Sequence, residues 1–480
     1  IWIYGRPMTL INNTKWVAVS QFSRVGLQLL GMLFLARLLG PADYGVMAMA
    51  MIVVNLANLL RDLGTSAAVV QRDELDENAK ATVFWLNFGV GLTLSALVAG
   101  LATLIGYIFV SPNLPKVLWL LALGFPITAS SAVHQALLER QSQFKLLARV
   151  EILSSGMGLS VAILLAHFGF GVFCLPAQIL TAAALSSTQL WMLSRWRPVR
   201  KFNVESFKSL FSYSGNLTAF NLINYFARNA DSIVVGKLLG AVQLGVYSQA
   251  YRVMLFPLQN MTFVATRALF PLLSRHQSEP LVLRNLYLKT VMMVVTITGP
   301  LMCGIWVLRS EFVHIVFGAK WSAVVPVLAW LAPVGFIQSV VSTTGTVFMA
   351  TGNTKSLMKL GLIATVLQVG GFIIGAFWDV NHVAAMYALA NLINFFVAMT
   401  ATMKHLGSGI SYLLARISRP LAICAVMMVC MTVLRIKLID AGMSALPLAI
   451  LVSALGAAVY GLMGFGWIKK TVFTFAEKRA

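Results

Sequence analysis

Two stretches of the chain place polar side chains at helical spacing inside otherwise apolar sequence. The first set is Gln21, Arg24, Gln28 and Gly31, and the second is Asn221, Asn224, Arg228 and Asp231. Steps of three and four residues put each set on one face of a helix, and the two sets lie at matching positions 200 residues apart. We expect both faces to line one shared cavity, although polar bonding between packed helices gives the same pattern.

Arginine is the most informative side chain in these apolar stretches, because its guanidinium stays charged and its planar fork matches phosphate and carboxylate. These two stretches and the apolar segments that follow each of them, 43–63 and 243–273, contain five arginines: Arg24, Arg61, Arg228, Arg252 and Arg267. The acids well inside the same stretches are Asp62 and Asp231. Two acids do not neutralise five cations, so we predict an anionic ligand unless water reaches the excess charge. Arg61 and Arg267 could instead extend to the aqueous surface, and Arg228 could pair with Asp231.

Other side chains in the apolar stretches could serve ion coupling or bonding between helices. Asp231 and Asp62 are our ion-coupling candidates, with Glu151 as a further acid. Amides such as Gln338 and Asn391 either extend the cavity or bond between helices. The sequence has no clustered Cys and His, no phosphate-binding glycine loop and no catalytic acid pair, so we expect no metal, cofactor, ATP or enzymatic step.

The amino-acid composition indicates that these residues belong to a membrane protein. Of 480 residues, 59% are hydrophobic and 11% are charged, whereas a soluble domain carries about 25% charged residues. The excess apolar side chains must therefore face lipid. A spanning helix takes roughly 20 residues, and fourteen apolar segments of suitable length follow one another: 16–37, 43–63, 82–109, 116–138, 149–167, 170–193, 209–238, 243–273, 288–308, 323–350, 357–378, 382–403, 417–435 and 445–468. The predicted fold class is an all-α polytopic membrane protein with about 14 transmembrane helices.

Lys and Arg are distributed unevenly between alternate breaks in this pattern. With the N-terminus inside, 24 of the 36 fall in cytoplasmic segments, seven fall on the opposite side and five lie inside apolar segments. Such a bias is typical of cytoplasmic loops, so we expect both termini in the cytoplasm. The net charge of +21 then reflects loops beside anionic lipid and not nucleic-acid binding.

The chain also repeats itself at an offset of 200 residues. Residues 35–50 read LARLLGPADYGVMAMA and residues 235–250 read VGKLLGAVQLGVYSQA, with six of sixteen positions identical. Each copy is the first loop of a six-span block, and such repeats are related by an axis along the membrane normal. We predict two pseudo-symmetric six-helix lobes around a central cavity, with two additional C-terminal helices: 1–200, 201–404 and 405–480.

These motifs, together with ATRALFPLLSR at 265–275, resemble the Wzx-type bacterial polysaccharide flippases of the multidrug/oligosaccharidyl-lipid/polysaccharide superfamily, nearest to colanic-acid and exopolysaccharide exporters. The resemblance implies alternating-access translocation of undecaprenyl-diphosphate-linked oligosaccharide repeat units from the inner to the outer leaflet of the bacterial cytoplasmic membrane. It also implies that Arg24, Arg61 and Arg252 engage the diphosphate or acidic sugars. Coupling to a proton or sodium gradient, and a polysaccharide polymerase and other assembly proteins as partners, are further implications.

Three alternatives remain open from the sequence. A multidrug antiporter of the same superfamily would favour an acidic cavity for cationic substrates, against the balance of arginines over aspartates. A membrane glycosyltransferase or polymerase would need a catalytic acid pair and a sizeable external loop. A non-transporting scaffold of a polysaccharide assembly complex would use the polar stripes only for packing.

Overall fold

The computed structural model contains helices and the turns between them, without a strand, in the residues that it describes: 7–61, 77–199, 214–259, 263–277 and 279–472. Contacts divide the chain after Gly245 into two compact units, which we call the N-terminal and C-terminal units. The all-α fold class is confirmed. The predicted lobe boundaries at residues 200 and 404 stay predictions.

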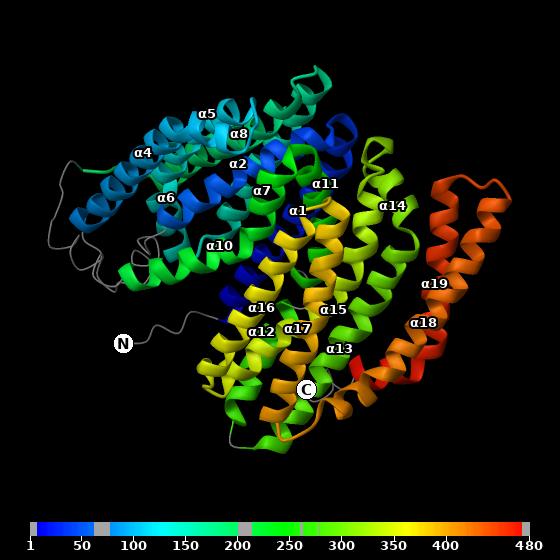
Figure 1. Ribbon diagram of the computed structural model, residues 1–480. Helices are drawn as coiled ribbons and strands as arrows, with labels where there is room; N and C mark the ends of the chain where they lie inside the picture. Colours follow the sequence, from blue (N-terminus) through cyan, green and yellow to red (C-terminus); the bar gives the residue numbers. More distant parts are fainter. Residues whose placement is uncertain (1–6, 62–76, 200–213, 260–262, 278, 473–480) are drawn as a thin grey trace. The chain divides into compact units, whose positions relative to one another are not determined.

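The N-terminal unit is drawn from blue to green in Figure 1. Its elements are α1 (Pro7–Leu38), α2 (Pro41–Arg61), α4 (Glu77–Ile108), α5 (Leu114–Ala122), α6 (Gly124–Arg140), α7 (Phe144–His167), η1 (Gly171–Phe173), α8 (Cys174–Ser194), α10 (Ser214–Leu238) and the start of α11 (Gly240–Pro257). Helix α7 packs against both α1 and α8, and α6 packs against both α4 and α8.

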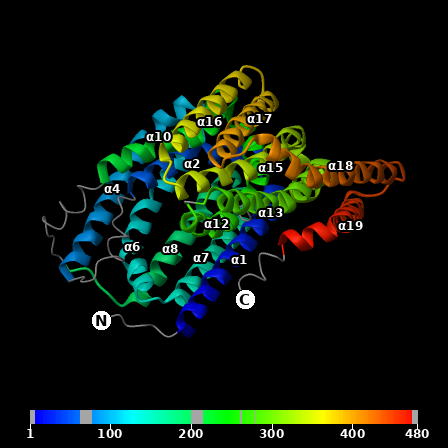
Figure 2. The same cartoon turned by 90° about the horizontal axis from the view of Figure 1, so that it is seen from below.

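The C-terminal unit contains the rest of α11 and the remaining helices. They are α12 (Phe263–Arg275), α13 (Pro280–Val307), α14 (Arg309–Val316), η3 (Ala319–Trp321), α15 (Val324–Ala350), α16 (Thr354–Gly375), α17 (Val380–His405), α18 (Ile410–Asp440) and α19 (Ala445–Val472). Helices α15 and α17 pack together, and α18 and α19 lie side by side in both Figure 1 and Figure 2.

Several helices begin and end where local sequence dictates. Helix α17 follows Asp379, whose Oδ1 accepts a hydrogen bond from the backbone N–H of His382 at 2.9 Å. Helix α16 follows Asn353, whose Oδ1 accepts from the backbone N–H of Ser356 at 3.2 Å. These are N-caps, which satisfy backbone donors that the first helical turn leaves without partners. Gly407 has a φ of +68° just after α17, the left-handed conformation that commonly ends a helix.

Twelve helices in the described ranges are long and apolar enough to cross a membrane. They correspond to twelve of the fourteen predicted segments, so a multi-pass membrane protein is confirmed and the count of fourteen is not. The two other predicted segments, 209–238 and 243–273, carry many of the polar residues discussed above and correspond to α10 and to α11 with α12. Because two consecutive segments are involved, the sidedness expected for all the others is the same with either count.

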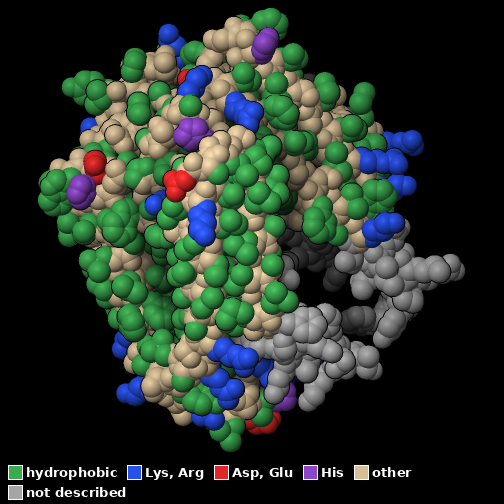
Figure 3. Space-filling view, turned by 90° about the vertical axis from the view of Figure 1, so that its right-hand side faces the viewer, with side chains coloured by type: hydrophobic (Ala, Val, Ile, Leu, Met, Phe, Trp, Pro, Cys, Tyr) green, Lys and Arg blue, Asp and Glu red, His purple; other side chains and the backbone are tan. Residues whose placement is uncertain are grey.

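Helix α18 shows how the surface of the C-terminal unit suits lipid. Its outward face carries apolar side chains at steps of three and four residues, with exposed fractions between 41% and 63%: Val426, Val429, Val433 and Ile436. Met427 and Met431 on the other face are buried. Figure 3 shows a band of hydrophobic side chains between groups of Lys and Arg. Exposed apolar area of this extent fits a hydrocarbon solvent and not water.

The repeated motif contacts its own second copy. A Cβ atom added at Gly45 would overlap the backbone carbonyl of Ala241, and one added at Gly245 would overlap the backbone carbonyl of Pro41. Pro41 and Ala241 are themselves equivalent at the offset of 200. The contact is therefore reciprocal, as in an isologous interface, and it requires glycine at both positions.

Candidate functional site

A polar pocket of about 370 Å³ lies inside the N-terminal unit. Helices α2, α4, α6 and α8 line it, and Arg61 at the end of α2 is the cation among the lining residues. Arg61 Nη1 donates a hydrogen bond to Thr128 Oγ1 at 2.5 Å. Asn87 and Ser131, which also line the pocket, are 5% and 7% exposed. The structure thus places Arg61 at the wall of a cavity, and its role as a ligand stays a prediction.

Helix α6 supplies a polar stripe to this pocket that the sequence reasoning missed. The stripe consists of Thr128, Ser131, Gln135 and Glu139, all of which line the pocket. Steps of three, four and four residues place them on one face of α6. Gln135 Nε2 donates to Glu139 Oε1 at 2.8 Å. The spacing was a usable signal, although short hydroxyl side chains in an apolar segment contrast weakly with their neighbours.

The polar stripe of α1 forms a second cluster, against α7. Arg24 Nη1 lies 3.6 Å from Glu151 Oε1, and the two side chains are 58% and 37% exposed. Arg24 also donates to Gln21 Oε1, and Ser20 donates to Glu151 Oε2. Glu151 therefore neutralises Arg24 at least in part. Polar bonding between packed helices, the alternative reading of this stripe, accounts for Gln21 and Arg24.

Further along α1, the other two members of the stripe, Gln28 and Gly31, lie in different surroundings. Gln28 is exposed. A Cβ added at Gly31 would lie 3.3 Å from Leu159 Cδ1 of α7, so Gly31 serves close packing. The structure brings together Gln21 and Arg24 with Glu151, but it does not give all four members of the stripe one common ligand environment.

The predicted site residues of α10 differ in how deeply they are buried. Asn224 and Arg228 are exposed, whereas Asp231 is 4% exposed. Asp231 Oδ1 accepts a hydrogen bond from the backbone N–H of Ser232 at 2.6 Å. On the same helix, Tyr225 donates its hydroxyl to the carbonyl oxygen of Ile52 and so ties α10 to α2. Asp62, and the side chains of Asn221 and Arg267, lie outside the described residues.

Arg252 belongs to the C-terminal unit, where it is exposed on α11. The ring of the preceding residue, Tyr251, lies 6.3 Å from the Tyr387 ring of α17. Gln338 of α15 donates to Tyr387 Oη at 2.5 Å and to Asn391 Oδ1 at 3.1 Å. These amides form hydrogen bonds between α15 and α17, which favours bonding between helices over lining the cavity.

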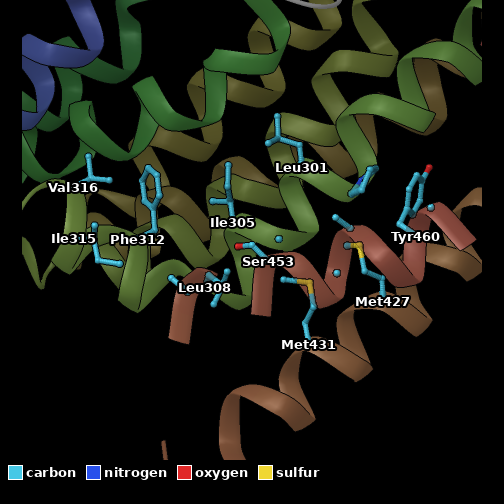
Figure 4. Close-up of a pocket in the computed structure, with 16 residues that line it drawn as sticks. Leu301, Ile305, Leu308, Phe312, Ile315, Val316, Met427, Met431, Ser453 and Tyr460 are labelled. Atoms are coloured by element: carbon cyan, nitrogen blue, oxygen red, sulfur yellow. The ribbon is translucent and has the colours of Figure 1, made fainter. Parts of the chain in front are cut away.

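An apolar pocket of about 540 Å³ lies inside the C-terminal unit, between α13, α14, α18 and α19. Figure 4 shows that its side chains converge from all four helices, among them Ile305, Phe312 and Met431. Ser453 and Tyr460 contribute the side-chain hydroxyl groups of the lining. Such a surface can accept a hydrocarbon chain and cannot satisfy a charged or sugar group.

Metal-binding groupings are absent from the part of the chain that the structure describes, since it brings no three His, Cys, Asp or Glu residues together. The four cysteines are free thiols.

Comparison with known proteins gives a consistent family. A sequence model described as polysaccharide biosynthesis protein matches residues 34–326. The lipopolysaccharide biosynthesis protein WzxC of Escherichia coli (strain K12) is 29% identical over 76% of this chain and 75% of its own length. The teichuronic acid biosynthesis protein TuaB of Bacillus subtilis (strain 168) is 27% identical over 87% of each chain. The succinoglycan biosynthesis transport protein ExoT of Rhizobium meliloti is 28% identical over 79% of this chain and 76% of its own.

Solved structures identify the fold. The lipid II flippase MurJ, in an inward closed conformation, matches 96% of this chain and 100% of its own with a TM-score of 0.74 at 14% identity. An inward-facing multidrug resistance MATE family transporter of the MOP superfamily matches 79% of this chain and 94% of its own with a TM-score of 0.58 at 16% identity. At these identities the likeness concerns the fold alone.

Proposed function

Because this chain belongs to the polysaccharide biosynthesis protein family and has the fold of the MOP superfamily, as its sequence motifs predicted, we propose that it is a flippase for lipid-linked oligosaccharides. Its substrate would be an undecaprenyl-diphosphate-linked repeat unit, moved from the inner to the outer leaflet of the bacterial cytoplasmic membrane. Both termini would lie in the cytoplasm. The step breaks no covalent bond, so it requires no catalytic residue.

One observation supports this substrate most directly: the protein provides a polar pocket and an apolar pocket in separate places. The polar pocket contains Arg61, and the apolar pocket lies between α13, α14, α18 and α19. A lipid-linked oligosaccharide is an amphiphile whose sugars and diphosphate need hydrogen bonds and positive charge, while its polyprenyl chain needs hydrocarbon surroundings. A small cationic drug would need neither arginine nor an apolar pocket for a hydrocarbon chain.

The arginines would lower the free energy of the diphosphate while it crosses the membrane. We propose Arg24, Arg61, Arg228, Arg252 and Arg267 as ligands of the headgroup, that is, of its diphosphate or its sugars, together with the amides Gln21, Gln28, Asn221 and Asn224. The arginines would not contribute equally to this binding, because Glu151 already binds Arg24. Alternating access would expose these groups first to one side of the membrane and then to the other. Asp231 and Asp62 remain the acids proposed for coupling to a proton or sodium gradient.

The test begins with deletion of the gene and identification of the lipid-linked oligosaccharide that accumulates. That lipid is then reconstituted with the purified full-length protein in liposomes, and its transfer between leaflets is followed by enzymatic modification of accessible headgroups. We expect transfer by the wild type and a loss of at least tenfold in Arg61→Ala. Arg416→Ala is the control, because Arg416 is exposed on α18 and bonds Tyr412 of the same helix.

Two results would contradict the proposal. The first is the absence of lipid transfer by stable wild-type protein, combined with transport of a cationic dye, which would support the antiporter alternative. The second is normal polysaccharide export by cells that carry only stable, correctly inserted Arg24→Ala/Arg61→Ala protein. That result would assign the arginines to packing and support a scaffold.

A further inference from the structure

We infer that the polar pocket of the N-terminal unit binds a sugar ring of the substrate headgroup beyond the first sugar, and thereby selects which repeat unit is moved. This inference rests on the proposed function, and it adds a binding site with its own ligand class. The site is the pocket of about 370 Å³ that α2, α4, α6 and α8 enclose. This volume lies in the range of small-molecule sites.

The lining has the mixture of hydrogen-bonding groups that a sugar requires. Arg61 only donates, ionised Glu139 only accepts, and the amides of Asn87 and Gln135 do both. A sugar ring presents neighbouring hydroxyl groups, each of which also donates and accepts. The pocket offers complementary partners to such a ring from three different helices.

Two other ligands fit the lining less well. A free phosphate would gain from Arg61 but would bring its negative charge close to Glu139, which lies in the same pocket. A hydrocarbon chain would exclude water from the polar groups of Arg61, Gln135 and Glu139 and offer them no hydrogen bond in return, at a cost in free energy. The combination of opposite charges and amides therefore favours a neutral polyhydroxylated group.

The pocket is also organised before any ligand arrives. Thr128 donates its hydroxyl to the carbonyl oxygen of Gly124 at 2.8 Å, so its Oγ1 is free to accept from Arg61 at 2.5 Å. This pair of bonds holds the guanidinium at the wall. Gln135 and Glu139 bond each other at 2.8 Å. Side chains that are held in place lose less conformational entropy when a ligand binds.

Space for a ring comes from small residues. Four alanines also line the pocket: Ala129, Ala132, Ala136 and Ala183. A larger side chain at Ala183 would occupy the cavity without removing a polar group. By the orientation proposed above, the pocket lies toward the cytoplasmic ends of its helices, since α2 ends at Arg61 and α6 ends at Arg140. A headgroup that arrives from the cytoplasm would meet it first.

The experiment compares two natural substrates in the same liposomes. One is the complete lipid-linked repeat unit, and the other is its truncated form with only the first sugar, taken from a host that lacks the later glycosyltransferases. The variants are Gln135→Ala, which removes one exposed amide, and Ala183→Leu, which fills the cavity. Ser160→Ala is the matched control, because the Ser160 hydroxyl lies on the exposed side of α7 and bonds the carbonyl oxygen of Gly156 in the same helix.

We expect Gln135→Ala to slow transfer of the complete unit about two- to tenfold, the range for one lost hydrogen bond, and Ala183→Leu to slow it at least as much because the leucine occupies the space of the ring. Transfer of the truncated unit should change less than about twofold in both variants. The control should leave both rates unchanged. Equal slowing of both substrates, or of neither, in folded variants would overturn the inference while the flippase function stands. If wild-type protein moves neither lipid, the proposed function itself fails.

Discussion

Gly45 and Gly245, at equivalent positions of the two repeats, each lie against the backbone of the opposite copy. Gly45 faces the carbonyl of Ala241, and Gly245 faces the carbonyl of Pro41. At so close an approach a hydrogen atom is the largest substituent that fits, because the obstacle is main chain and not the end of a flexible side chain. The contact ties α2 to the α10–α11 turn.

This geometry predicts that alanine is not tolerated at either glycine. Gly45→Ala and Gly245→Ala should each destabilise the protein by about 2 kcal/mol or more, at the upper part of the range for overpacked sites. The measurement is thermal unfolding of the purified protein in detergent, together with polysaccharide export in cells. Both substitutions push the same two segments apart, so the double variant should lose less than the sum of the single losses.

Gly89 provides the control for this series. It lies within α4 and has no neighbouring atom within 4 Å of the position that a Cβ would take. Gly89→Ala should therefore raise stability by about 0.5–1 kcal/mol through its helix propensity. Equal tolerance of alanine at Gly45 and Gly89 would contradict the close contact.

The sequence allowed the repeat to be found but not the reciprocity of its contact. Matching letters at an offset of 200 predict two copies of one structural unit, and Gly45/Gly245 was among the matches. Which surfaces of the copies touch depends on packing between helices that are distant in the chain. A glycine that recurs in both copies predicts only a turn or a close approach. The pair of contacts with Pro41 and Ala241 is seen only in the three-dimensional structure.

The same limit applies to the candidate site. Helical spacing correctly placed Gln21 and Arg24 on one polar face, yet it did not identify Glu151 of α7 as the partner of Arg24. Charge in an apolar segment is easy to detect, so Arg61 was singled out. The hydroxyl and amide groups that surround it on α6 were not, because their polarity is weaker and their neighbours are alanines.

The pair of Arg24 and Glu151 gives a prediction that separates ligand binding from packing. If Arg24 binds the headgroup, Glu151→Gln should keep export within about twofold, since it removes only a partner of a partly exposed pair, worth about 1 kcal/mol or less. Arg24→Ala should lower export at least tenfold. Initial export rates in complemented deletion cells are the measurement.

The charge-exchanged variant Arg24→Glu/Glu151→Arg completes this comparison. It retains an ion pair between α1 and α7 but places the guanidinium on the other helix. Under the ligand role export stays low in the exchanged variant, although the protein is stable. Restoration of normal export would mean that the pair only holds the two helices together.

The N-cap of α17 predicts a dependence of stability on pH. Asp379 lies outside the spanning helices, and the hydrogen bond from the backbone N–H of His382 is the main cause that lowers the pKa of its carboxyl group. A lowered folded-state pKa means that the cap stabilises the protein above the unfolded-state pKa, near 3.9. The contribution is lost as the pH falls through the lower folded-state value.

Asp379→Ala should accordingly reduce stability by about 0.5–2 kcal/mol at neutral pH. The difference from the wild type should shrink as the pH falls below about 4 and the Asp379 carboxylate is protonated. Thermal unfolding over this range measures it. Asp379→Asn is the control, because asparagine also caps helices but does not ionise, so this variant should keep most of the stability without the acid loss.

The apolar pocket of the C-terminal unit predicts an effect that depends on the length of the lipid. Gly461 lines the pocket, and a Cβ at this position would have no atom within 4 Å. Gly461→Phe should therefore fill the groove of about 540 Å³ without displacing the backbone. If the groove holds part of the polyprenyl chain, the variant should raise the KM for the natural long-chain substrate several-fold. A synthetic substrate with only two isoprene units should be transferred at the wild-type rate, because it is too short to depend on the groove.

Val429→Phe, on the lipid-exposed face of α18, is the matched control and should leave both rates unchanged. If Gly461→Phe slows the short and the long substrate equally, the groove serves helix packing or conformational change, and the polyprenyl chain remains in the surrounding lipid.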